Sequence, residues 1–272
     1  MFTGDLTQQA LIVAIGLAAG LIGGLTGLGG SLVILPGLAL FVGFADVSHA
    51  EQHTYQAAAM AVNFFVAVPA TWRHSKAGAI RQAILVRLLP TGTACIILGA
   101  LASDRIEGVV LVKILAGVIA LMVILGEVSN RFGPARDDGL TDDQRIKRAT
   151  PTIVGTGVVT GFVAGLLGTG GGVITVTSLQ AIGRIPIRQA IAASTALMCL
   201  MSPIGCATKM ASLSQHAQDP MDAVRLIGLL GPAAIIGSLA GSSLVHILPT
   251  KIVRRIVAVV LLLAAAKLAG LF

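Results

Sequence analysis

Charged residues are scarce in this sequence. Asp, Glu, Lys and Arg make up only 11% of its 272 residues, whereas 55% of the residues are hydrophobic. A soluble globular domain of this size needs a more polar surface, so the composition excludes that class. Long apolar runs separate the few charges, and they predict an all-α polytopic membrane protein.

Aromatic residues are also few, at 4% of the chain, although the net charge is +7. A nucleic-acid-binding protein would be expected to combine a basic stripe with stacking residues, and no such combination occurs here. The sequence therefore predicts no nucleic-acid partner. The basic excess is better explained by cytoplasmic loops of a membrane protein.

The middle of every apolar run lacks Asp and Glu, which fall at segment ends or in loops. A carboxylate proton relay or an acidic cation site is therefore not expected. No Ser/His/Asp, HExxH or paired-carboxylate arrangement lies within the membrane, which predicts a protein that is not an enzyme and needs no cofactor. The cysteines form no metal or disulfide motif and are predicted to be small buried side chains: Cys95, Cys199 and Cys206.

The apolar segments divide into two groups of similar plan. A polar stretch over 128–150 is predicted to be a cytoplasmic linker between a first transmembrane repeat, 1–127, and a second, 151–272. The apolar segments are predicted at about 10–28, 32–45, 55–72, 84–102, 108–127, 152–169, 172–183, 189–208, 224–246 and 251–270.

A glycine cluster interrupts the first apolar pair of each half. Five glycines recur with an offset of 141 residues: Gly20, Gly24, Gly27, Gly29 and Gly30, then Gly161, Gly165, Gly168, Gly170 and Gly171. Glycine permits positive φ and close backbone approach, so each cluster predicts two short helices meeting at an irregular turn. A repeated broken helix of this kind is typical of a transporter binding site.

The distribution of Lys and Arg favours two inverted repeats. If each broken pair enters and leaves on one side, fourteen Lys and Arg lie in the cytoplasm and five outside. If each pair counts as one crossing, the split is eleven to eight, a weaker positive-inside bias. The expected fold therefore has about 8–10 membrane segments, with each half built from a broken pair and three further helices. The N-terminus is predicted outside and loops 73–87 and 128–150 inside; re-entrant hairpins and two tilted crossings remain equally open for the broken pairs.

These motifs resemble the signature of the TauE/SafE sulfite exporter family, also called the 4-toluenesulfonate uptake permease family. The similar features are the glycine pattern with Ser31 and Pro36, the loop His74-Ser-Lys-Ala-Gly78, and the stretch that contains Ser194 and Thr195. The sequence departs from the family where Ala58 and Ala59 replace a Thr-Ser pair, Ser31 replaces a glycine, and Thr177 replaces a proline.

The resemblance covers essentially the whole chain and implies a secondary transporter of the cytoplasmic (inner) membrane. The implied substrate is a small sulfur-containing anion, such as sulfite, a sulfonate or thiosulfate, or a similar organic anion. The departures leave the particular anion open. Composition and periodicity alone indicate only a secondary transporter with inverted repeats. The expected partners are membrane lipid and, as the resemblance implies, a small anionic substrate. This anion is expected to carry the coupling itself, by its own protonation or by flow down its gradient.

The predicted substrate site lies between the two glycine turns. A helix that begins after Gly30 or Gly171 presents unpaired N–H groups and the positive end of its dipole to an anion. The site residues are predicted to be Thr26, Gly29, Gly30, Ser31, Asn63, Thr169, Gly170, Gly171, Gly172, Ser194 and Thr195. The alternative role of the glycines is tight helix packing, which is expected for Gly20, Gly24, Gly161 and Gly165.

Other polar residues have simpler predicted roles. Lys209 lies near a segment end and is expected to extend its side chain toward the interface, while His53 is expected to be an interfacial anchor. A passive anion channel or a membrane anchor subunit without transport would share many of these features. Small-residue surfaces would also suit a homodimer, and the sequence does not decide between that and packing within one chain.

Overall fold

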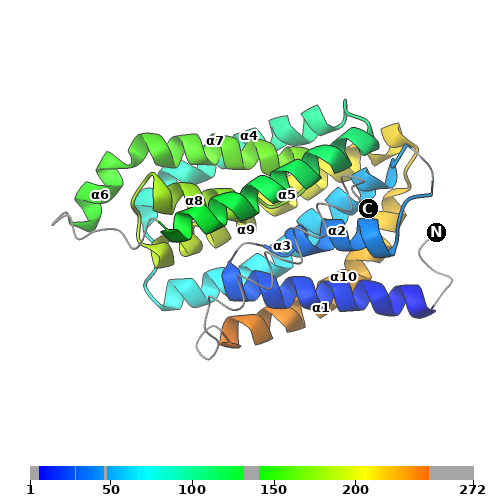
Figure 1. Cartoon of the computed structure of the whole chain (residues 1–272), viewed down its shortest axis with the longest axis horizontal. Coiled ribbons are helices and arrows are strands. Elements are labelled where there is room, and N and C mark those ends of the chain that lie inside the picture. The colour runs from blue at the N-terminus through cyan, green and yellow to red at the C-terminus, as the bar shows by residue number, and fades with distance from the viewer. Residues whose placement is uncertain (1–5, 28, 46–47, 132–140, 245–272) are drawn as a thin grey trace.

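The structure is a computed structural model that describes residues 6–27, 29–45, 48–131 and 141–244. This part of the chain is all-helical and contains no strand (Figure 1). The elements are α1 (Leu6–Thr26), α2 (Ser31–Phe41), α3 (Glu51–Lys76), α4 (Gln82–Ser103), α5 (Gly108–Arg131), α6 (Asp142–Arg148), α7 (Thr150–Leu167), α8 (Gly172–Ala181), α9 (Ile187–Ser212), the 3₁₀ turn η1 (Leu213–His216) and α10 (Pro220–Leu244). The predicted apolar segment 251–270 lies outside the described residues.

Both predicted helix breaks occur at the glycine clusters. α1 gives way to α2 across residues 27–30, and α7 gives way to α8 across residues 168–171. The turn glycines adopt positive φ, between 67° and 89°, at Gly27, Gly29, Gly168, Gly170 and Gly171. A residue with a Cβ rarely adopts this conformation, so the prediction of two glycine turns is confirmed.

The two longest helices, α3 and α9, pack against each other at the centre of the bundle. Around them, α1 packs along α10 and α4 packs along α7, so each of these pairs joins one half of the chain to the other (Figure 1). The residue numbers of the contacting pairs increase together along the two helices: Gly16, Gly20 and Gly24 of α1 lie against Leu230, Ala234 and Ser238 of α10, respectively. α1 and α10 therefore run parallel.

The glycines that precede each turn allow two helix backbones to touch. A Cβ at Gly20 would lie 2.1 Å from the carbonyl oxygen of Ala234 on α10. A Cβ at Gly161 would lie 2.3 Å from the carbonyl oxygen of Gly92 on α4. Both distances are shorter than atomic contact allows, so the predicted packing role of these glycines is confirmed.

The bundle carries apolar side chains outward and polar side chains inward. Five described helices are long and apolar enough to cross a membrane, namely α1, α4, α7, α9 and α10, and α2, α8 and the described part of α5 are shorter apolar helices. By contrast, α3 holds several buried polar residues, including Gln56 and Asn63. Its place at the centre keeps these groups away from lipid.

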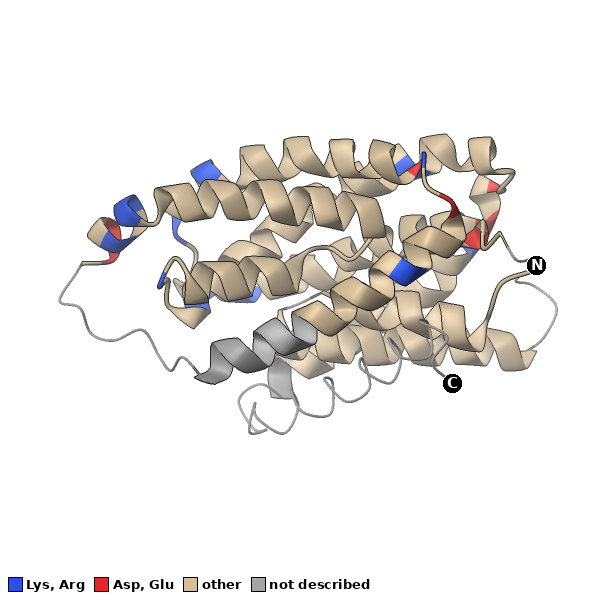
Figure 2. Cartoon of the chain, turned by 45° about the horizontal axis from the view of Figure 1, so that its top comes forward, with Lys and Arg blue, Asp and Glu red and all other residues tan. Residues whose placement is uncertain are grey.

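Charge is distributed unevenly along the bundle. Figure 2 shows most Lys and Arg at the end that carries α6, and the acidic residues outside α6 at the opposite end. At the α6 end, Asp142 joins the two halves, because its Oδ2 accepts hydrogen bonds from Arg81 at 2.7 Å and from Gln189 at 2.8 Å. The linker thus contacts both halves on one side of the bundle.

We predict that Gly161→Ala lowers the midpoint of thermal unfolding in detergent, because the added methyl forces α7 away from α4. Overpacking of this kind costs about 1 to 3 kcal/mol. The matched control is Gly155→Ala on the same helix, where a Cβ meets nothing within 4 Å. The control is expected to unfold at the wild-type midpoint or slightly above it, since alanine favours helix. Equal destabilisation by the two variants would contradict the packing role.

Candidate functional site

The two glycine turns meet at Asn63, which lies halfway along the 26-residue helix α3. Its Oδ1 accepts hydrogen bonds from the backbone N–H groups of Gly30, at 2.9 Å, and Ser31, at 3.0 Å. These are donors at the start of α2, and no local side chain caps them. Asn63 therefore supplies from α3 the acceptor that a helix N-terminus requires.

The other side of the same amide faces the second glycine turn. A Cβ at Gly170 would lie 2.5 Å from Asn63 Nδ2, and one at Gly29 would lie 3.2 Å from Asn63 Oδ1. Met198 of α9 lies against both turns, with its Sδ 3.0 Å from the Cβ position of Gly29 and 3.4 Å from that of Gly170. Only glycine leaves room for this convergence of α3, α9 and the two turns.

Several buried donors near the turns have no hydrogen-bond partner among the described residues. They are Asn63 Nδ2, Ser31 Oγ and Thr169 Oγ1, on side chains that are at most 1% exposed. Ser202 Oγ, one helical turn after Met198 on α9, is also unpartnered. A buried donor without a partner costs about 1 to 3 kcal/mol, so such a concentration of them suits a polar ligand.

The structure brings most of the predicted site residues together. Asn63 touches Gly29, Gly30, Ser31 and Gly170. Gly172 begins α8 directly after Gly171, the N-terminal cap residue of that helix, and Thr169 lies in the turn before it. The side chain of Thr26 lies outside the described residues.

The hydroxyls of the predicted pair on α9 are already engaged. Ser194 Oγ donates to the carbonyl oxygen of Gly172 at 3.3 Å, and Thr195 Oγ1 donates to that of Ala192 in its own helix at 3.1 Å. Ser194 thus ties α9 to the start of α8, whereas Thr195 makes the back-bond that hydroxyls favour within helices. Both residues border the turns.

One detail of the predicted site is wrong. The N–H groups at the start of α2 were expected to be unpaired and open to an anion, but those of Gly30 and Ser31 are bonded to Asn63. The acceptor comes from a residue more than thirty positions away, so helix boundaries alone do not reveal it. At the first turn, the Ser31 hydroxyl is a buried side-chain donor without a partner among the described residues.

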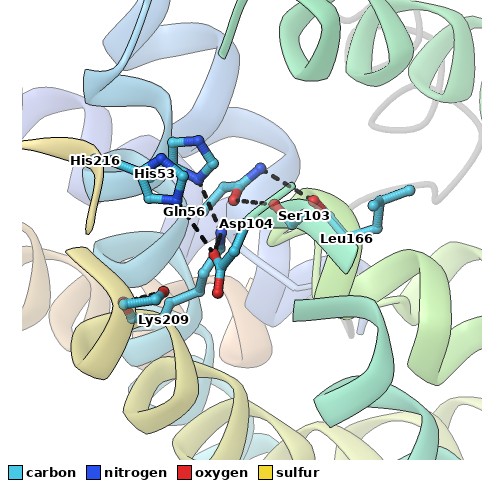
Figure 3. Close-up of polar contacts among 8 residues, drawn as sticks. His53, Gln56, Ser103, Asp104, Leu166, Lys209 and His216 are labelled. Carbon is cyan, nitrogen blue, oxygen red and sulfur yellow. Dashed lines mark hydrogen bonds and ion pairs between the residues drawn. The ribbon is translucent and has the colours of Figure 1, made fainter. Parts of the chain in front are cut away.

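Figure 3 shows a second polar cluster. It lies where α4 ends at Ser103, whereas Arg81, at the other end of that helix, contacts α6. Lys209 of α9 is fully buried, and its Nζ lies 2.6 Å from Asp104 Oδ1 and 2.9 Å from His53 Nδ1. His216 of η1 stacks on His53, with ring centroids 3.7 Å apart. The expectation that Lys209 reaches the interface is therefore wrong, as is the interfacial role of His53, which is 1% exposed.

This cluster has ligand atoms spaced as in a metal site, but the ammonium group of Lys209 lies among them. Ligand atoms of His53, Asp104 and His216 lie within 4.8 Å of one another. The ammonium of Lys209 contacts two of these three residues, so it supplies the positive charge that a metal ion would otherwise bring. A cation would have to displace it.

Sequence reasoning missed Met198, Gln56 and the Lys209 cluster. Met198 has no distinctive signal within an apolar helix. Gln56 and His53 are three residues apart, which places them on one face of α3, and this spacing could have drawn attention to them. The pairing of Asp104 with Lys209 joins residues 105 positions apart and needs the three-dimensional fold.

Comparison with known proteins gives one family. The model of the family described as "Sulfite exporter TauE/SafE" matches residues 12–268. Two similar proteins are called probable membrane transporter protein MamO. The one from Paramagnetospirillum magneticum is 26% identical over 94% of this chain and 44% of its own length. The one from Magnetospirillum gryphiswaldense is 26% identical over 93% of this chain and 43% of its own length.

A probable membrane transporter protein of Methanocaldococcus jannaschii is 24% identical over 71% of this chain and 68% of its own length. The chain thus spans less than half the length of the two MamO proteins that it matches. No solved structure matches the chain.

We predict that Asn63→Ala lowers the free energy of unfolding by about 2 kcal/mol or more, because the buried N–H groups of Gly30 and Ser31 lose their acceptor. Ser31→Ala removes a hydroxyl that has no partner and leaves both N–H groups bonded to Asn63, so this control is expected to retain most of the stability. Chemical denaturation in detergent measures both. Equal stability of wild type and Asn63→Ala would show that Asn63 does not cap α2.

Proposed function

Because the chain belongs to the TauE/SafE sulfite exporter family, we propose that it moves a small sulfur-containing anion across the cytoplasmic membrane, binding it between the two glycine turns. Sulfite, a sulfonate, thiosulfate or a similar organic anion has the matching chemistry. The observation that carries the proposal is the set of buried, unpartnered donors around Asn63. Amide and hydroxyl donors suit sulfur oxyanions, whose oxygens accept several hydrogen bonds.

The electrostatics of the turns favour an anion. α2 and α8 begin there, so the positive ends of two helix dipoles point toward the same region. The predicted site contains no acidic side chain that would repel an anion. The donors on Ser31, Asn63 and Thr169 add directional hydrogen bonds to this field, and the three side chains come from three different segments of the chain.

The two halves are inverted relative to each other. If each glycine turn reverses the chain, α1 and α4 of the first half run in opposite directions, and so do α7 and α10 of the second half. α1 of the first half runs parallel to α10 of the second, and α4 runs parallel to α7, as the paired glycine contacts indicate. Parallel repeats would make both pairs antiparallel, so the registers support inversion.

The turns lie near the middle of the membrane. They contact Asn63, which is halfway along α3, and α2 and α8 have only 11 and 10 residues. A helix of that length covers about 15 Å, or half of the hydrocarbon core. Each broken pair therefore enters and returns on the same side, with the end that carries α6 in the cytoplasm and the N-terminus outside.

Burial of the site favours a carrier over an open channel. Ser31, Asn63 and Thr169 are at most 1% exposed, so the anion needs a conformational change to reach them. A membrane anchor without transport has no use for buried donors that lack partners, since each of them costs stability.

Residues 215 and 77 are expected to face opposite sides of the membrane. In a variant whose native cysteines are replaced by alanine, Gln215→Cys should react with an impermeant thiol reagent on intact cells. Ala77→Cys should react only after permeabilisation. Both positions are exposed and lie at opposite ends of the bundle. Reaction of both from the same side would overturn the inverted arrangement.

We predict that one sulfur oxyanion raises the unfolding midpoint of the purified protein when sulfite, thiosulfate, methanesulfonate, sulfate and acetate are compared. At one hundred times Kd, a bound ligand stabilises the native state by about 2.7 kcal/mol. Thr169→Val should lose most of this response while remaining folded, because valine has the shape of threonine but no hydroxyl donor, and the Thr169 hydroxyl has no partner to lose.

The matched control is Thr208→Val. The Thr208 hydroxyl donates to the carbonyl oxygen of Ile204 in its own helix at 2.9 Å, so its loss should leave the anion response unchanged. If no anion stabilises the protein, the transport proposal fails. If Thr169→Val responds like wild type, the anion binds elsewhere.

A further inference from the structure

The cluster of His53, Asp104, Lys209 and His216 has a balanced charge that one proton would upset. With Lys209 as ammonium, Asp104 as carboxylate and both imidazoles neutral, its net charge is zero. Nδ1 of His53 lies 2.9 Å from the Lys209 ammonium, which has only donors, so this nitrogen serves as an acceptor. That role prevents His53 from taking a proton at Nδ1 while the contact lasts.

His216 is the residue of this cluster that is placed to accept a proton. Its Nε2 has no hydrogen-bond partner among the described residues and lies 3.7 Å from Asp104 Oδ1. Its side chain is 18% exposed, compared with 9% for Asp104 and none for Lys209, so it is the more accessible to solvent. An imidazole ordinarily titrates near pH 6.5; burial and the nearby Lys209 ammonium lower the pKa of His216 from this value, and Asp104 opposes that shift.

The cluster is joined to the second glycine turn by Gln56. Ser103, which precedes Asp104, donates to Gln56 Oε1 at 3.1 Å, and Gln56 Nε2 donates to the carbonyl oxygen of Leu166 at 3.1 Å (Figure 3). Gln56 also packs on Gly168, whose Cβ position lies 3.0 Å from it. Gln56 therefore connects the residue before Asp104 to the end of α7, where the second turn begins.

The Lys209 cluster and the candidate anion site at the glycine turns also contact the same face of α3. His53, Gln56 and Asn63 are spaced by three and seven residues, which keeps them on one side of the helix. Ten residues separate His53 from Asn63, or about 15 Å along the axis. At that distance inside a protein, a charge gained at one site still changes the affinity of the other, because screening by solvent is weak.

We propose that these four residues form a proton-binding site in which His216 takes the proton, and that this proton and the transported anion bind together. The linkage to an anion rests on the proposed function, whereas proton binding does not. A protonated His216 forms an ion pair with Asp104 and leaves the buried cluster with one net positive charge. An anion at the glycine turns offsets that charge, so each ligand favours binding of the other.

This proposal changes the coupling expected from the sequence, in which the anion alone carried it. Asp104 follows the last turn of α4 in sequence, but the fold buries it against Lys209 of the other half. The pair therefore provides a titratable network inside the protein without a carboxylate in the middle of any apolar segment. The charged and titratable groups that face His216 are Asp104, Lys209 and His53.

The proton site can be tested without an anion by nuclear magnetic resonance of the full chain carrying isotope-labelled histidine. Comparison with His216→Gln assigns the His216 signal, and His74→Gln, at the opposite end of α3, is the control. The expected result is that His216 titrates between pH 5 and 8. A ring that stays in one protonation state across this range would overturn the proposal.

Thiosulfate affinity at pH 5.5, 6.5 and 7.5 tests the linkage, since thiosulfate itself does not titrate there. Wild type and His74→Gln should bind about fivefold or more tightly at pH 5.5 than at pH 7.5. His216→Gln should bind with no such dependence. A pH dependence that survives in His216→Gln would overturn the linkage.

Two outcomes separate this proposal from the transport proposal. If His216 titrates but none of sulfite, thiosulfate and methanesulfonate binds at any pH, the proton site stands and the anion proposal fails. If Zn²⁺ at a concentration equal to that of the protein stabilises the wild type but not His216→Gln, and suppresses titration of His216, the cluster is a metal site. The proton proposal is then wrong.

Discussion

The amide of Asn63 is the interaction on which the centre of the molecule depends. Its oxygen accepts from two backbone N–H groups of the first glycine turn, while its nitrogen faces the second turn. One uncharged side chain thus connects the two halves without adding a charge to the centre of a membrane protein. Because an asparagine has both a donor and an acceptor, it can bind one turn and still offer a hydrogen bond to a ligand.

This arrangement requires close backbone approach throughout the bundle. The turns can converge on Asn63 only because glycines at 29 and 170 carry no Cβ, and the flanking helices reach their positions through the glycine contacts of α1 with α10 and of α4 with α7. The contacts of α1 with α10 and of α4 with α7 each join one half of the chain to the other. The same type of residue therefore sets both the packing and the shape of the candidate site, where Asn63 and Met198 lie against both turns.

Much of this architecture could be predicted from the sequence. Regular apolar segments and repeated glycines predicted the helices, the two turns and the packing role of Gly20 and Gly161, because these features depend on local composition and spacing. The cap from Asn63 to Gly30 and the ion pair of Asp104 with Lys209 could not be predicted, since both join distant segments. Lys209 illustrates the limit, because a lysine near a segment end usually reaches water, but here a partner from the other half compensates its burial.

The most direct test of the central claim is an experimental structure of the protein with a brominated short sulfonate, located by the anomalous signal of bromine. We expect a single bound anion between the glycine turns, with its sulfonate oxygens within hydrogen-bond distance of Asn63 Nδ2 and the hydroxyls of Ser31 or Thr169. A sulfonate bound away from both turns, with Asn63 Nδ2 still unpartnered, would contradict it.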